Sequence, residues 1–219
     1  INGRQRNPKI TNAYLLLGKA RYLDQRFVPA LDAFNQVYKQ PRTNELWDQS
    51  VIWKAKSNIR LEQEALAIEL LKTLLETEEI NTQNKARANA VLSMAYLQIG
   101  QDKKAFKPLK TAAEIEPNKT NKARYFYVLG QLLEKKSKRD SANIYFKKVA
   151  KFHRKIPREF YVNAKLKTLL YDSLETKEKE SQIIKMIDNY ENEDFLDKIY
   201  YSYSMLLFYN DSISKGKNY

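Results

Sequence analysis

The sequence predicts an all-α protein, folded as a right-handed superhelical solenoid of stacked helix hairpins. Only five glycines and six prolines interrupt its 219 residues, and long stretches consist of alanine, leucine, lysine, glutamate and glutamine. These five residue types favour helices. A pattern of small and large residues also recurs at intervals of 34 to 40 residues, which is typical of proteins built from helix-hairpin repeats.

The clearest repeat covers residues 92–117. It reads as a helix, a turn at Gly100, a second helix and a stop at Pro117. Its pattern of small and large residues is carried by Leu92, Ala95, Tyr96, Ala105, Leu109, Ala112 and Pro117. This order resembles positions 7, 10, 11, 20, 24, 27 and 32 of the 34-residue tetratricopeptide pattern, in which large residues fill the gaps between closely packed helices.

Two further copies carry a glycine at position 8 of the same pattern. Gly18 and Gly130 hold this position, and Phe34 and Phe146 hold position 24 in the second helix of each copy. Because glycine has no side chain to keep two helices apart, we expect both glycines to be buried where the helices of a hairpin touch.

The remaining copies are weaker. We place Trp53 at position 8 of the second repeat, with an inter-helix loop two residues longer than in the others. Ala164 and Ser204 hold position 8 in degenerate fifth and sixth copies, and 183–190 forms the second helix of the fifth. The predicted hairpins cover 11–41, 46–79, 85–118, 122–155 and 158–191, with a partial sixth over 196–219.

We expect residues 1–219 to form a single continuous repeat domain, because each hairpin of a solenoid buries its apolar face only against its neighbours. The last helix carries an apolar run that no later hairpin would cover. We therefore expect these side chains to be exposed and the chain to be a fragment of a longer protein. The residues are Ile199, Tyr200, Tyr203, Met205, Leu206, Leu207 and Phe208.

The sequence offers no constellation for catalysis. It contains no cysteine, no paired nucleophile and base, and no phosphate-binding loop. Its one histidine, His153, lies among cations and is expected to be solvated, and the carboxylate clusters at 76–79 and 191–194 are expected to solvate turns. No apolar run approaches the roughly 20 residues that cross a bilayer. We predict no enzyme activity, no catalytic residue, no metal site and no cofactor.

The chain is strongly basic. It has 39 Lys and Arg against 26 Asp and Glu, a net charge of +13, which favours anionic partners. Ten basic residues accompany a single acid within 135–158. This block is either a solvated helix face or a docking patch, formed by Lys147, Lys148 and Lys151, for an acidic protein or an anionic membrane surface. RNA is a third alternative, although the sequence contains no recognised RNA-binding motif.

A second set of candidates lies at the first-helix positions that face the inner groove of such repeats. Position 2 is a cation in four successive repeats, and position 5 is tyrosine in the last three. A cation followed three residues later by tyrosine places both on one helix face. We predict a partner-binding groove for an extended peptide with carboxylates, since arginine pairs with carboxylates and tyrosine anchors interfaces. Its residues are Arg87, Arg124, Tyr127, Arg158, Tyr161, Lys198 and Tyr201.

The first repeat carries a more specific resemblance. Residues 7–35 resemble the corresponding stretch of the SprE/PorW family, the tetratricopeptide lipoproteins of bacterial gliding motility and type IX secretion. Residues 160–165 and 197–201 are also similar to that family. The resemblance implies a long repeat protein in the periplasm, anchored to the outer membrane by an N-terminal lipid outside this sequence. It also implies a connection between the secretion motor and the translocon.

We therefore predict a non-catalytic protein–protein interaction scaffold in a secretion or motility complex, located in the periplasm. Its partners would be other proteins of that complex, bound through acidic or extended segments. The alternative function is a basic helical-repeat protein that binds nucleic acid or an anionic membrane surface, and the alternative compartment is the cytoplasm. Of these partners nucleic acid is not favoured, and membrane contact is expected only through the lipid anchor.

Overall fold

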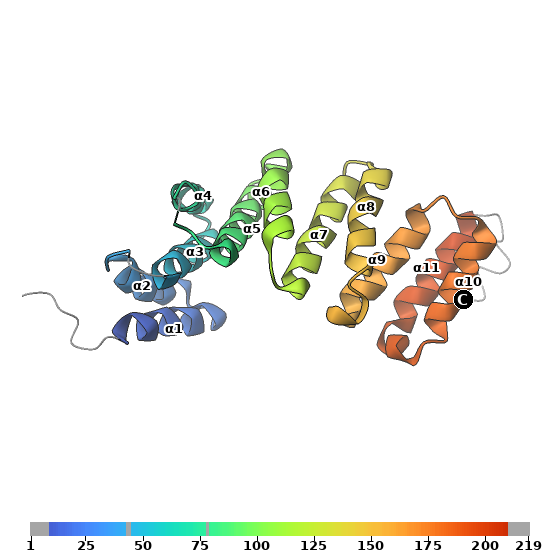
Figure 1. The fold of residues 1–219 in the computed structure, drawn as a ribbon, viewed down its shortest axis with the longest axis horizontal. Helices are drawn as coiled ribbons and strands as arrows, with labels where there is room; N and C mark the ends of the chain where they lie inside the picture. The colour runs from blue at the N-terminus through green and yellow to red at the C-terminus, as the bar shows by residue number, and fades with distance from the viewer. Residues whose placement is uncertain (1–8, 43–44, 78, 210–219) are drawn as a thin grey trace, which may run out of the picture. The chain divides into compact units, whose positions relative to one another are not determined.

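The computed structural model describes residues 9–42, 45–77 and 79–209. Within these ranges the chain consists of helices and turns, and consecutive helices pair as hairpins (Figure 1). The predicted all-α stack of helix hairpins is confirmed. The chain divides into two compact units, unit 1 up to Pro117 and unit 2 from Asn118. That they form one continuous repeat domain stays a prediction, and residues 210–219 of the predicted sixth hairpin lie outside the described residues.

The described part of unit 1 consists of three hairpins, drawn from blue to green in Figure 1. In each hairpin the second helix packs against the first, and α3 also contacts α2, so neighbouring hairpins stack on one another. The helices are α1 Ile10–Leu23, α2 Phe27–Tyr38, α3 Glu45–Arg60, α4 Glu64–Leu75, α5 Thr82–Gln98 and α6 Asp102–Ile115.

The described part of unit 2 continues with two hairpins and a further helix. Its α-helices are α7 Lys119–Glu134, α8 Arg139–Ala150, α9 Arg158–Tyr171, α10 Thr176–Ile187 and α11 Leu196–Tyr209. Two short 3-10 helices, η1 His153–Lys155 and η2 Tyr190–Phe195, lie between them. α9 packs against α8, and α11 packs against α10 and α9.

The first four hairpins share one turn between their two helices. A residue with positive φ follows the first helix, and the second helix begins two residues after it. The next backbone N–H donates to the carbonyl five residues before it, which satisfies a carbonyl that the helix end would leave unpaired. The positive-φ residues are Gln25, Glu62, Gly100 and Ser137. The donor and acceptor pairs are Arg26 and Arg21, Gln63 and Asn58, Gln101 and Tyr96, and Lys138 and Leu133.

This shared turn defines the register of the repeats. Seven residues before the positive-φ residue stand Gly18, Ser93 and Gly130 in the first, third and fourth repeats, as predicted. In the second repeat that place belongs to Ala55, not Trp53, and the predicted longer loop is wrong. Ala55 is fully buried at the helix contact, where a tryptophan side chain would hold the helices apart.

Replacing Glu62 by glycine is expected to raise the free energy of unfolding by about 1 kcal/mol. The left-handed conformation costs a residue with a side chain about 1–2 kcal/mol, and glycine avoids this cost. Glycine also loses more conformational entropy on folding, so the net stabilisation is smaller than the full cost. Urea unfolding of Glu62→Gly measures the difference. Glu64→Gly, two residues later in α4, is the matched control and should lower stability by about 1 kcal/mol. Equal effects of the two substitutions would contradict the assigned turn.

Both predicted glycine contacts are confirmed. A Cβ atom built on Gly130 would lie 2.6 Å from Cε1 of Phe146, and one built on Gly18 would overlap the ring of Phe34. The two phenylalanines are fully buried. Each ring therefore occupies the space that a side chain on the facing helix would need.

The fifth hairpin departs from this pattern. The C-cap of α9, Asp172, is extended, with φ −73° and ψ 149°, and none of residues 172–175 has a positive φ. The second helix starts at Thr176 rather than at 183 as predicted, and Tyr190 belongs to η2 instead of to that helix. Without the shared turn, the repeat positions of α9 do not have to follow the spacing of the earlier repeats. This affects which residues of α9 face the site described below.

Four of the seven apolar residues of the last helix are buried, contrary to the prediction: Ile199, Tyr203, Leu206 and Leu207. Ile199 and Leu207 are fully buried in a cluster with Val162 of α9 and Ile183 of α10. Only Phe208 among the described large side chains at its end is exposed. The prediction was wrong for the buried residues because α11 turns this part of its apolar stripe toward the preceding hairpin.

Candidate protein-binding site

One cavity of unit 2 brings together three of the seven predicted groove residues. It has a volume of about 450 Å³ and is lined by residues of α7, α9 and α11. The predicted residues in it are Tyr127 of α7 and Lys198 and Tyr201 of α11. Asn163 and Lys167 of α9 also line this α9 cavity, and neither was expected from the sequence.

The two tyrosines of the α9 cavity differ in exposure and in the contacts of their rings. Tyr127 is half-buried, and its ring centroid lies 5.3 Å from that of Phe146 and 6.5 Å from that of Phe160. Burial, and then the nearby carboxylates Glu134 and Glu159, raise the pKa of the Tyr127 hydroxyl. Tyr201 is 68% exposed. The cavity therefore combines a fixed aromatic wall with a large aromatic side chain that no neighbour covers.

The lysines of the α9 cavity already have carboxylate partners. Lys198 Nζ lies 3.3 Å from Glu159 Oε1, and both side chains are substantially exposed. Lys167 Nζ donates to Glu134 Oε1 over 2.6 Å, and the Tyr171 hydroxyl donates to the same carboxylate oxygen. Burial and the Glu134 carboxylate raise the pKa of Tyr171. Glu134 thus holds Lys167 in the wall of the cavity, whereas the exposed Lys198 pair can exchange partners at small cost.

Solved structures with the same arrangement of hairpins show which fold this is. A tetratricopeptide repeat protein from Parabacteroides merdae matches with a TM-score of 0.63 and 15% identity, over 96% of this chain and 77% of that one. The TPR-like repeats of a kinesin light chain from Podosopora anserina match with a TM-score of 0.61 and 14% identity, over 90% and 95%. The chain has the tetratricopeptide fold.

The MamA protein is a third structure with this fold, with a TM-score of 0.56 and 19% identity over 95% of this chain and 96% of that one. No protein-family model and no curated protein matches the sequence. The chain therefore shares the tetratricopeptide architecture with proteins whose sequences are very different from its own.

The orientation of α9 explains why Tyr161 is not in the α9 cavity. Val162, Leu166 and Leu169 form the buried stripe of α9. Asn163 and Lys167 lie on the side of this stripe that faces the α9 cavity. Tyr161 lies on the other side and lines a different cavity of about 480 Å³. The groove side of α9 is therefore displaced by two residues from the predicted frame, and the apolar stripe is the sequence signal that could have located it.

Arg158 is held by an internal ion pair. Its Nη1 lies 2.9 Å from Glu191 Oε2, and its Nε donates to Asn192 Oδ1 over 2.7 Å. Its guanidinium carbon also lies 4.6 Å from the ring centroid of Tyr161. The cluster at 191–194, predicted to solvate a turn, instead supplies the partner of a largely buried arginine. That prediction is corrected for Glu191.

The other two predicted groove cations lie in different units. Arg124 of unit 2 is exposed, and its guanidinium carbon lies 5.9 Å from the ring centroid of Phe160. Arg87 of unit 1 is half-buried. The pKa of Lys19 is lowered mainly by the burial of Lys19 and, to a smaller extent, by the positive charge of Arg87. A single groove that contains all seven residues stays a prediction.

The predicted docking patch is partly engaged within unit 2. Lys147 Nζ lies 2.9 Å from Asp172 Oδ2, and hydrogen bonding to Lys147 lowers the pKa of the Asp172 carboxyl. Lys148 Nζ lies 5.0 Å from the ring centroid of Phe126. Lys151 is exposed and lines the 480 Å³ cavity with Lys147 and Tyr161. The lysines therefore contact their own protein as well as solvent.

His153 is exposed at the start of η1 and has a positive φ of 48°. Its ring meets that of Tyr161 edge-on, with centroids 4.7 Å apart. Within the described ranges, no group of three or more His, Asp or Glu side chains is placed to bind a metal. No helix in those ranges is long and apolar enough to span a bilayer.

Proposed function

We propose that this chain is a protein-binding scaffold that holds a partner segment in the α9 cavity. The observation that supports this function most directly is Tyr201, a large aromatic side chain that is 68% exposed at a cavity. Tyrosine and arginine are the usual anchors of protein interfaces, because burying them on binding removes a large area from water. Tyr127 on the opposite helix supplies a fixed ring against which a partner side chain can pack.

An extended segment with an acidic residue suits this cavity. Lys198 can release Glu159, since that pair is exposed, and take a carboxylate of the partner in its place. Asn163 offers an amide that can bond the partner backbone. The α9 cavity therefore provides two aromatic surfaces, one exchangeable cation and one amide within a single concave site.

The finer role we propose is that of a component of the type IX secretion and gliding machinery, held at the periplasmic side of the outer membrane by a lipid outside this sequence. Its support is the resemblance of residues 7–35 to the SprE/PorW family. The alternative as a nucleic-acid or membrane-binding basic protein has weaker support. Lys147 and Lys148 of the basic block are already engaged with Asp172 and Phe126.

Replacing Tyr201 and Lys198 together by alanine is expected to weaken partner binding about 30-fold, or about 2 kcal/mol, without unfolding the protein. The partner would be isolated by cross-linking from periplasmic extract and its affinity measured with purified components. Tyr190 is 82% exposed outside the cavity, so Tyr190→Ala with Lys185→Ala is the matched control. Equal affinities of the two double variants would exclude the α9 cavity as the binding site.

A further inference from the structure

A pocket in unit 1 combines a rigid aromatic wall with polar side chains. It has a volume of about 510 Å³ and lies between α2 and α4, with one face of α3 exposed to it. Trp47, Val51, Lys54 and Asn58 are the α3 residues that line it. Their spacing of four, three and four residues places them on a single helix face. This α3 pocket shares no residue with the α9 cavity.

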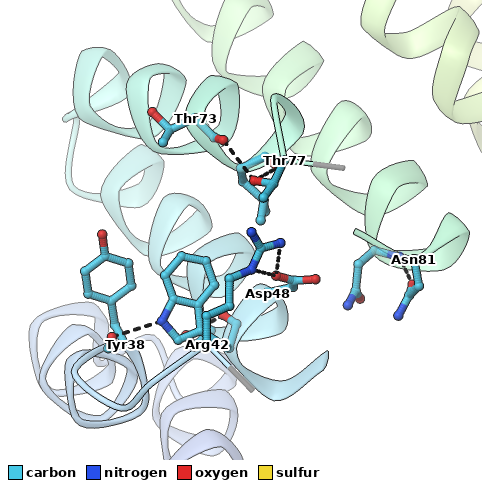
Figure 2. Close-up of polar contacts among 10 residues, drawn as sticks. Tyr38, Arg42, Asp48, Thr73, Thr77 and Asn81 are labelled. Atoms are coloured by element: carbon cyan, nitrogen blue, oxygen red, sulfur yellow. Dashed lines mark hydrogen bonds and ion pairs between the residues drawn. The ribbon is translucent and has the colours of Figure 1, made fainter. Parts of the chain in front are cut away.

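The wall of the α3 pocket is held by interactions that Figure 2 shows around Tyr38, Arg42 and Asp48. The rings of Tyr38 and Trp47 stack with centroids 5.1 Å apart, and Trp47 Nε1 donates to the carbonyl of Tyr38 over 3.0 Å. Arg42 lies over Trp47 and donates from Nε and Nη2 to Asp48 Oδ1, which is buried. The wall is therefore preformed, and the charge of Arg42 is already balanced.

Two polar residues of α3 line the α3 pocket at repeat positions that are apolar in the third repeat. In the register defined by the shared turn, Lys54 and Asn58 hold positions 7 and 11. The third repeat has Leu92 and Tyr96 at these positions, and both are buried. Large apolar side chains there fill the gap between neighbouring second helices. The second repeat leaves this gap open and turns polar groups into it.

Within the described part of the chain Lys54 has no counter-ion, and Asn58 lines the same pocket. Lys54 Nζ lies 4.4 Å from the ring centroid of Tyr38, and no carboxylate of the described residues lies within ion-pair distance of it. Burial lowers its pKa. Asn58 is only 4% exposed, but it lines the pocket, where its side-chain amide is available to a ligand. Glu69 also lines the pocket, but it is exposed and does not pair with Lys54.

We propose that the α3 pocket binds the acidic side chain of an extended segment of a partner protein, with its carboxylate between Lys54 and Asn58. A half-buried ammonium that pairs with no carboxylate of the described residues is stabilised when a partner's carboxylate accepts its hydrogen bonds, and the Asn58 amide can donate to the same carboxylate. The Tyr38 and Trp47 rings pack against the aliphatic part of the same side chain. Leu66, exposed on α4 at the pocket, supplies apolar contact for a neighbouring residue of the segment.

This site is independent of the α9 cavity and goes beyond the proposed function. It adds a second place, in the other unit, at which the same scaffold contacts an extended protein segment. Variants of the α9 cavity should leave binding at the α3 pocket unchanged. Failure of one proposal can therefore be distinguished from failure of the other.

Two blocked pentapeptides test the proposal, one with a single Glu between two leucines and the other with Gln in its place. Trp47 lines the pocket and Trp53 does not, so tryptophan fluorescence of the whole chain follows binding. We expect the Glu peptide to bind at least ten-fold more tightly than the Gln peptide. Lys54→Met should abolish this preference, and Lys72→Met, an equal loss of charge at an exposed site on α4 outside the pocket, should retain it.

Asn58→Leu is a second variant that keeps the proposal falsifiable if Lys54→Met does not fold. It restores an apolar residue at position 11, so it should remove peptide binding and leave the melting temperature unchanged or raised. Equal binding of the Glu and Gln peptides, or equal effects of Lys54→Met and Lys72→Met, would overturn the proposal. Propionate serves as a free carboxylate, and propionate binding as tight as that of the Glu peptide would overturn the assignment to a protein segment.

Discussion

Gly130→Leu is expected to lower the free energy of unfolding by about 3 kcal/mol, at the upper end of the usual cost of overpacking. The first atom of the new side chain would lie 2.6 Å from a ring carbon of Phe146. That ring is fully buried and packs against Tyr127 at an interplanar angle of 58°. It cannot move away without opening the contact between α7 and α8. Thermal and urea unfolding, monitored by circular dichroism, measure the loss.

Gly18→Leu should behave in the same way, because Phe34 occupies the space beside Gly18 in α1. The control is Gly100→Ala, where the added Cβ would meet no atom within 4 Å. Its cost comes from the positive φ of 71° alone and should be about 1 kcal/mol. A melting temperature of Gly130→Leu equal to that of the wild type would refute the helix contact and the register built on it.

The repeat register could be predicted where small residues mark the helix contacts. Gly18 and Gly130 are such marks, and both lie at the predicted contacts. In the second repeat the contact residue is Ala55, which is one of many alanines in the chain, while Trp53 is the more conspicuous residue nearby. The turn that would have corrected this assignment has Glu62 at its positive-φ position. Glutamate carries no sequence signal for that conformation.

The candidate site was predicted in part for the same reason. Tyr127, Lys198 and Tyr201 share a cavity because α7 and α11 each present the predicted face to it. The fifth repeat lacks the shared turn, so the face of α9 could not be predicted from the distance to earlier repeats. Asn163 and Lys167 were missed as a result.

The α3 pocket could not be predicted from the sequence because the second repeat was assigned the wrong register. When Trp53 is placed at position 8, Lys54 and Asn58 fall at positions 9 and 13, where the repeat pattern does not require an apolar residue. In the corrected register they fall at positions 7 and 11, where tetratricopeptide repeats place large apolar side chains. A polar residue at such a position contradicts the local pattern, and contradictions of this kind are often found at functional sites.

Replacing Arg158 by methionine is expected to lower the free energy of unfolding by about 3 kcal/mol. Arg158 is 17% exposed in its side chain and pairs with Glu191, whose side chain is 22% exposed. It also donates to Asn192, which is buried and donates in turn to the carbonyl of Met186. Removing Arg158 leaves the largely buried Glu191 carboxylate without this cation and the buried Asn192 Oδ1 without its donor, so their loss of water is no longer compensated.

Arg154→Met is the matched control, because Arg154 pairs with the same carboxylate over 2.9 Å but has a side chain that is 70% exposed. Exposed ion pairs contribute little, so its cost should be below about 1 kcal/mol. The two variants lose the same charge and the same partner and differ mainly in burial. If Arg158 lay free in a groove, as predicted from its position in the repeat, the two substitutions would have equal and small effects on urea unfolding. A difference of about 2 kcal/mol between them would instead establish Arg158 and Glu191 as the contact that ties η2 to the start of α9.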